Sequence, residues 1–60
     1  MMKPEQVDWF IKFARDNALT NKNRYKEHKL PFHKIMYQYW VKKLKIEKEL
    51  KQALEELTNE

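Results

Sequence analysis

The C-terminal half of the chain repeats apolar residues with the period of an α-helix. From Phe32 to Leu57 they recur at steps of three and four residues, with no glycine or further proline between them. Since each helical residue turns by about 100°, most of these side chains fall within one arc about 100° wide, which we call the apolar stripe. The stripe consists of Phe32, Ile35, Met36, Tyr39, Ile46, Leu50, Ala53, Leu54 and Leu57. This pattern predicts one long helix over about residues 31–58.

The N-terminal third carries a second helical pattern. Pro4 suits a first helical turn, and the carboxylates of Glu5 and Asp8 suit the positive end of a helix dipole. Apolar residues follow at helical spacing, namely Val7, Phe10, Ile11, Ala14 and Ala18. We expect this helix to span about residues 4–19.

A basic connector is expected between the two helices. Thr20 and Asn21 are residue types that cap the start of a helix, so a short helix could form over residues 21–29. Pro31 would end it, because the residue before a proline is driven out of the helical conformation. The elements together predict an all-α helical hairpin, in a single domain that covers residues 1–60.

Length and composition leave a small chain with few ways to stabilise itself. A chain of 60 residues is marginal alone, because a domain of that size buries only about 60% of the surface that its unfolded form exposes. The absence of glycine argues against tight β-hairpins, and the absence of cysteine excludes disulfide bonds. Association with another subunit is the remaining usual support.

The chain shows no pattern for membrane insertion or secretion. No apolar run approaches the ~20 residues of a membrane span, and the N-terminus lacks the pattern of a signal peptide. We therefore expect a cytoplasmic protein with no membrane partner.

The long helix also predicts a homodimer. Its positions 32, 36, 39, 43, 46, 50, 53 and 57 form a heptad seam that only Lys43 interrupts. A first helix of about 16 residues, packed antiparallel, would reach only to about residue 48 and leave apolar side chains beyond it in water. The sequence is compatible with parallel and with antiparallel pairing of the two subunits. The expected dimer interface comprises Ile46, Leu50, Ala53, Leu54 and Leu57.

The long helix has a charged residue within this seam and a second apolar patch outside it. Lys43 either extends its ammonium past the stripe or pairs with an acid of the other chain, such as Glu47 or Glu49. The helix also has a second apolar patch, made of Tyr37, Trp40, Val41 and Leu44. We expect its N-terminal half to be covered from two directions.

Charge is strongly segregated along the sequence. Residues 21–45 hold eight basic side chains against the single acid Glu27, a formal charge of +7, whereas residues 1–20 are neutral and residues 46–60 carry −3. Such a block favours an anionic partner. Lysine and arginine neutralise phosphates whatever the base sequence, so we expect nucleic acid to be bound. The candidate side chains are Lys22, Arg24, Lys26, Lys29, Lys34, Lys42 and Lys45.

These lysines could equally form a solvated surface, and base reading has little support. Specific readout usually uses Arg, Asn or Gln, and only Arg24 with Asn21 and Asn23 is suitably placed. Lys34, Lys42 and Lys45 are expected on one face of the long helix, while the others lie in the connector. If nucleic acid is the partner, we expect most contacts to be made to its phosphates. The protein would then act as a regulator or accessory factor.

A protein-binding adaptor or inhibitor is the alternative function. Its basic side chains would meet an acidic protein surface, or Trp9, Phe10 and Phe13 would fill a groove, since exposed Trp is typical of binding hot spots. These aromatics would otherwise complete the core with Trp40 and Leu44, some of them across the dimer.

The sequence offers no catalytic arrangement. It has no glycine-rich phosphate loop and no nucleophile–base pairing, and it is too short to enclose a substrate pocket. His28 and His33 are five residues apart with no further ligand nearby, so no metal site is expected. We therefore expect no enzymatic activity, no cofactor and no small-molecule substrate.

Overall fold

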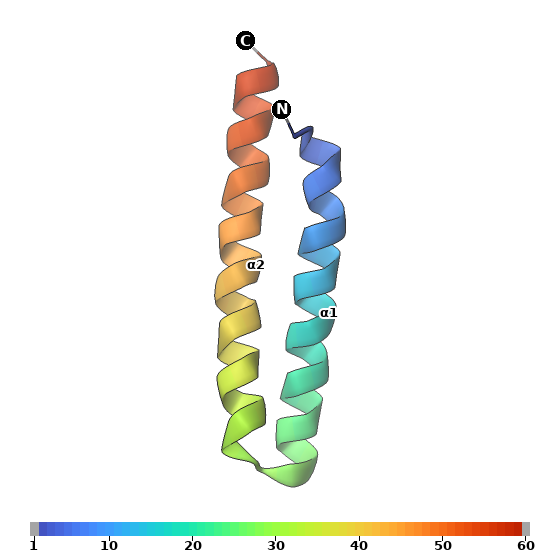
Figure 1. Cartoon of the computed structure of the whole chain (residues 1–60), viewed down its shortest axis with the longest axis vertical. Helices are drawn as coiled ribbons and strands as arrows, with labels where there is room; N and C mark the ends of the chain where they lie inside the picture. Colours follow the sequence, from blue (N-terminus) through green and yellow to red (C-terminus); the bar gives the residue numbers. More distant parts are fainter. Residues whose placement is uncertain (1, 60) are drawn as a thin grey trace.

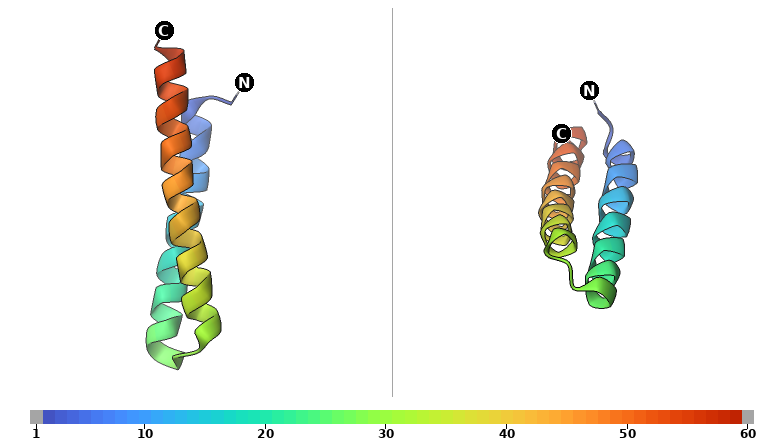
Figure 2. Two further views of the ribbon diagram at one scale, coloured as in Figure 1. Left: turned by 90° about the vertical axis from the view of Figure 1, so that its left-hand side faces the viewer. Right: turned by 60° about the horizontal axis from the view of Figure 1, so that its bottom comes forward.

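Two antiparallel helices make up the computed structural model, which describes residues 2–59 (Figure 1). Helix α1 spans Pro4–His28 and helix α2 spans Pro31–Thr58, and no strand occurs within residues 2–59. They form a rod of 48 × 14 × 14 Å, with both termini at the end opposite the loop (Figures 1 and 2). The prediction of an all-α helical hairpin is confirmed.

Helix α1 is longer than the sequence pattern suggested. The helix predicted over residues 4–19 continues without a break through Thr20 and Asn21 to His28, and the expected separate helix over 21–29 is wrong. Asn21 does not cap a new helix, since its side-chain amide donates to the carbonyl of Asn17 at 2.8 Å, one turn earlier. A polar side chain satisfied in this way is compatible with a helix interior.

The helices are joined by a turn at Lys29 and Leu30. Lys29 adopts the left-handed conformation (φ 57°), and its backbone N–H donates to the carbonyl of Tyr25 at 2.8 Å, which ends α1. Leu30 is extended, and Pro31 then starts α2 at a position where its missing N–H costs nothing. The reversal therefore occurs without glycine.

The core is a single line of contact between the helices. Ala14 and Ala18 are buried and small, so they allow the two backbones to approach closely. The buried and half-buried residues of α1 recur every three or four positions: Pro4, Val7, Ile11, Ala14, Asn17, Ala18, Asn21 and Tyr25. Those of α2 are His33, Met36, Tyr37, Trp40, Lys43, Leu44, Glu47, Lys51 and Leu54.

The arc of α2 that packs on α1 contains most of the second apolar patch and only Met36 and Leu54 of the apolar stripe. Tyr37, Trp40 and Leu44 are half-buried, whereas most of the stripe is exposed. Since α1 is 25 residues long and α2 is 28, the contact extends beyond the expected limit near residue 48. Apart from Met36 and Leu54, the stripe is thus left uncovered in both halves of α2, not only at its C-terminal end.

Ion pairs contribute to the same line of contact. Lys51 of α2 donates a hydrogen bond to the carboxylate of Asp8 in α1, and this bond is the main reason that the pKa of Lys51 is raised. Glu47 is only 8% exposed and lies 3.8 Å from the ammonium of Lys43 in the same helix. Its second carboxylate oxygen is buried without a hydrogen-bond partner.

Replacing Lys29 by glycine should stabilise the hairpin. The left-handed conformation costs a side-chain-bearing residue about 1–2 kcal/mol, and the greater freedom of glycine in the unfolded chain offsets part of that gain. We expect the free energy of unfolding in urea to rise by about 0.5–1 kcal/mol. Lys26→Gly, within α1, should instead lower it by about 1 kcal/mol. A loss of stability in Lys29→Gly would contradict the turn geometry.

Replacing Glu47 by methionine should also stabilise the protein. A buried carboxylate with one unsatisfied oxygen is costly, and an apolar side chain of similar size removes that cost. We expect Glu47→Met to raise the free energy of unfolding by about 1–3 kcal/mol. Glu49→Met, at an exposed position of the same helix, should change it by less than about 0.5 kcal/mol. Equal effects of the two substitutions would show that Glu47 is not in the core.

Candidate interaction surfaces

The charged block forms a groove near the loop. Its lining comes from both helices and the turn, and comprises Lys22, Tyr25, Lys26, Lys29, Lys34, Tyr37 and Gln38. We call this depression, of about 360 Å³, the basic groove. The turn explains the convergence, since it places the last two turns of α1 beside the first two turns of α2.

The positive charge of the basic groove is not neutralised within the described part of the chain. No acidic residue of positions 2–59 lines it, and none of its four lysines forms an ion pair with those positions. The single acid of the block, Glu27, instead lies 3.7 Å from the imidazole of His28. The ammonium of Lys29 lies 5.4 Å from the ring centre of Tyr25, where a cation–π interaction positions it.

The other predicted basic residues lie elsewhere. Lys42 lines a depression with Tyr39 and Ile46, and Arg24 is exposed on α1 outside the basic groove. Of the predicted side chains, the structure therefore brings together Lys22, Lys26, Lys29 and Lys34. Lys34, Lys42 and Lys45 lie within about 80° of one another around α2, as expected, but each lines a different depression and only Lys34 lines the basic groove.

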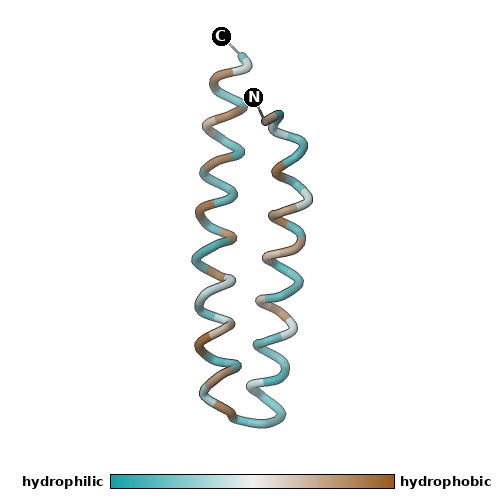
Figure 3. The backbone as a smooth tube through the Cα atoms, viewed as in Figure 1, coloured by the Kyte–Doolittle hydropathy of each residue, from teal (hydrophilic) through white to brown (hydrophobic). Residues whose placement is uncertain are grey.

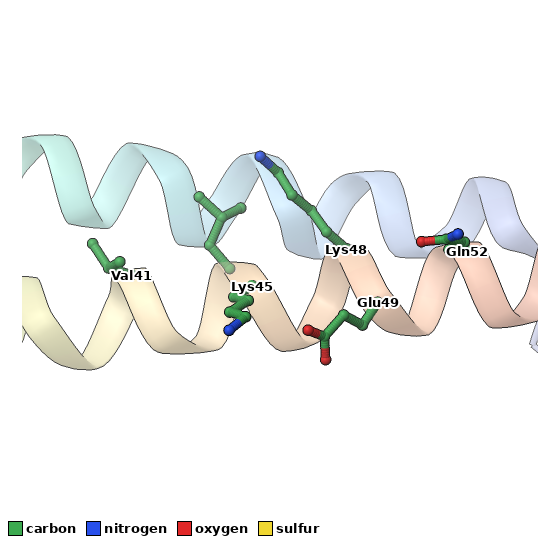
Figure 4. Close-up of a pocket in the computed structure, with 6 residues that line it drawn as sticks. Val41, Lys45, Lys48, Glu49 and Gln52 are labelled. Carbon is green, nitrogen blue, oxygen red and sulfur yellow. The ribbon is translucent and has the colours of Figure 1, made fainter.

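Lys45 belongs to a third region, on α2 beyond the basic groove. It lines a shallow depression with Lys48, Glu49 and Gln52 (Figure 4). Figure 4 shows Lys48 extending in the direction of α1, while Lys45 and Glu49 point the other way. The mixture of Lys45, Lys48 and Glu49 makes this depression much less basic than the groove.

The two histidines approach each other at the loop end. The rings of His28 and His33 are centred 6.2 Å apart, and the ring of Phe32 packs edge-on against His33. Within residues 2–59, no three side chains of the metal-binding types gather into a site.

An aromatic cluster connects the two helices. Trp9 stacks on Phe13 with their ring centres 5.2 Å apart, and Phe13 meets Trp40 of α2 edge-on at 5.4 Å. Phe10 packs against Trp9, and Tyr39 packs against Trp40. Phe13 meets Trp40 as expected, but Trp9, Phe10 and Phe13 are not buried within a single hairpin, and Trp9 is 62% accessible.

The aromatic cluster adjoins the exposed part of the stripe. Met2, Val7 and Phe10 line one depression together with Leu50 of α2, so the two helices share this surface. Apolar positions recur along the full length of α2 (Figure 3). We call the resulting surface the apolar face, and define it as Trp9, Phe10, Phe13, Tyr39, Ile46, Leu50 and Leu57.

One residue of the expected dimer interface lies inside the hairpin. Leu54 is only 7% exposed, because it belongs to the arc of α2 that meets α1, and it cannot contact another subunit. Ile46, Leu50, Ala53 and Leu57 remain exposed. Lys43 is half-buried and pairs with Glu47 of its own helix.

Comparisons with protein-family models, curated proteins and solved structures give no match for this chain. No helix among residues 2–59 is apolar over enough of its length to cross a lipid bilayer.

Proposed function

We propose that this chain is a small, non-enzymatic cytoplasmic protein that binds nucleic acid through phosphate contacts in the basic groove, as a homodimeric regulator or accessory factor. The observation that carries the proposal is the convergence of four lysines from both helices without an acid among the described residues of the lining. A concave surface of one charge concentrates the electrostatic field and attracts anions of the opposite charge.

The positions of the lysines suit an extended polyanion. Lys22 and Lys26 lie about one turn apart on α1, about 6 Å along its axis, and Lys34 lines the same groove from α2. Several phosphates of one strand can therefore be neutralised together, with release of their counterions. Tyr25 and Tyr37 are half-buried in the groove, so phosphate contacts would contribute more than base stacking.

The apolar face favours a second candidate, a protein-binding adaptor or inhibitor. Trp9 is 62% exposed and is supported by Phe10 and Phe13, as is typical of a binding hot spot. A folded partner protein with a matching groove would use this surface and not the basic groove. The two candidates therefore predict that different substitutions abolish binding.

Removing two groove lysines should weaken nucleic-acid binding. If four lysines each neutralise one phosphate, log K against log salt for duplex DNA should have a slope of about −3.6, and Lys22→Gln with Lys26→Gln should reduce it by about 2. We expect the affinity for a fluorescent oligonucleotide to fall by about 10–100-fold at low salt, as measured by anisotropy.

The matched control removes the same charge from another surface. Lys3→Gln with Lys12→Gln lowers the net charge equally but leaves the groove intact, so it should change the affinity by less than about threefold. Binding that is insensitive to salt, or an equal loss in both double variants, would refute the groove as the site.

A further inference from the structure

The apolar face is too extensive for a chain with so small a core. Within residues 2–59 the only buried hydrophobic residues are Val7, Ala14, Ala18 and Leu54. On the apolar face, by contrast, Ile46 is 63% exposed. Exposed apolar surfaces of this kind mark contacts with another molecule, and a domain of 60 residues usually needs such support.

We propose that the apolar face is covered by the same face of a second copy of the chain, with the two hairpins antiparallel, so that each dimer is a four-helix bundle. The proposal specifies the subunit arrangement that the proposed function assumes. A rod of 48 × 14 Å presents a side of roughly 650 Å² before side-chain relief is counted, near the ~800 Å² per partner of a stable interface.

The distribution of apolar residues favours the antiparallel arrangement. Face-to-face stacking with reversed hairpins sets α2 on α2 of the partner, where the stripe is continuous from Phe32 to Leu57. If both loops instead lay at the same end of the dimer, the N-terminal half of that stripe would pack on the last turns of α1 of the partner. There Asn17, Thr20 and Arg24 follow Phe13 at steps of four, three and four residues, so that surface is polar.

The exposed apolar residues of the heptad seam also meet one another in the antiparallel arrangement. With the two-fold axis at the midpoint of the stripe, between Leu44 and Lys45, position 32 lies opposite 57 and position 39 lies opposite 50. All four side chains are exposed on a single hairpin, so each pair covers apolar surface in an isologous interface.

Charge favours the same arrangement. Reversed hairpins place the basic segment 21–45, at +7, beside the acidic segment 46–60 of the partner, at −3. Hairpins with both loops at one end would place the two +7 segments together, and like charges in contact are unfavourable. A protein partner of another sequence would not be expected to supply this internal match.

The dimer would leave both basic grooves accessible. Lys22 follows Phe13 by nine residues, about 180° around α1, so the groove faces away from the apolar face. The two grooves then lie at opposite ends and on opposite sides of the bundle. If the groove binds phosphate as proposed, one dimer holds two separate nucleic-acid segments.

The arrangement is tested first without nucleic acid. Because the chain has no cysteine, Glu56→Cys on exposed α2 allows one spin label per subunit. Reversed hairpins separate the two labels by about 35 Å along the bundle axis, whereas hairpins with loops at one end bring them within about 20 Å. We expect a dimer in sedimentation and the longer distance in double electron–electron resonance. A monomer at tens of micromolar, or the shorter distance, would overturn the proposal.

A pair of substitutions tests which face is used. Ile46→Asp should convert the dimer to a monomer, whereas Val41→Asp should leave it dimeric, because Val41 is also exposed (41%) but lies about 140° around α2. Dissociation by both substitutions, or by neither, would exclude the apolar face as the interface. If Ile46→Asp fails to fold, as circular dichroism would show, the label distance in the otherwise unchanged chain still decides the question.

Bridging is tested last, with one biotinylated and one fluorescent oligonucleotide. The unchanged protein should retain the fluorescent strand on streptavidin, and Ile46→Asp should bind each strand without bridging them. A dimer with the longer label distance that binds no oligonucleotide would refute the proposed function and leave the subunit arrangement intact. A dimer that binds single strands but never bridges them would refute the outward placement of the grooves.

Discussion

The single line of contact between two helices is the constraint on which the rest of this structure depends. A helix in a hairpin can bury only the arc that faces its neighbour, and α1 fills that arc with small residues such as Ala14 and Ala18. On helix α2, the larger side chains of Trp40 and Leu44 lie in the arc that faces α1. Because α2 is apolar over two arcs, one of them must remain outside the contact.

The uncovered arc and the charge occupy different sides of the rod, which separates two possible kinds of binding. The aromatic cluster of Trp9, Phe13 and Trp40 extends the apolar surface across both helices. The basic groove lies on the opposite side of α1 from this cluster. An apolar contact made by the cluster would therefore not remove water from the lysines of the groove. Association through one side is therefore compatible with anion binding on the other.

The two helices and the direction of the hairpin were predictable because they depend on local signals. Pro4 and Pro31 mark the helix starts, and the apolar spacing identifies both helices. The end of α1 was not predictable from Thr20 and Asn21, because an asparagine side chain can cap a helix or donate to a carbonyl within one. The left-handed turn at Lys29 was not predictable either, because the residue that ends a helix in this conformation is usually glycine.

The candidate surfaces were also predictable only in part. The apolar stripe and the segment of charge +7 could be predicted from the amino-acid sequence, since both follow from composition and from the constant turn of about 100° per helical residue. The folded hairpin was needed to show that Leu54 and Glu47 lie inside, that Trp9 lies outside, and that four of the seven predicted basic residues converge. The rotation of each helix about its own axis decides these outcomes. That rotation depends on packing between residues far apart in the chain, such as Phe13 and Trp40, which no local pattern encodes.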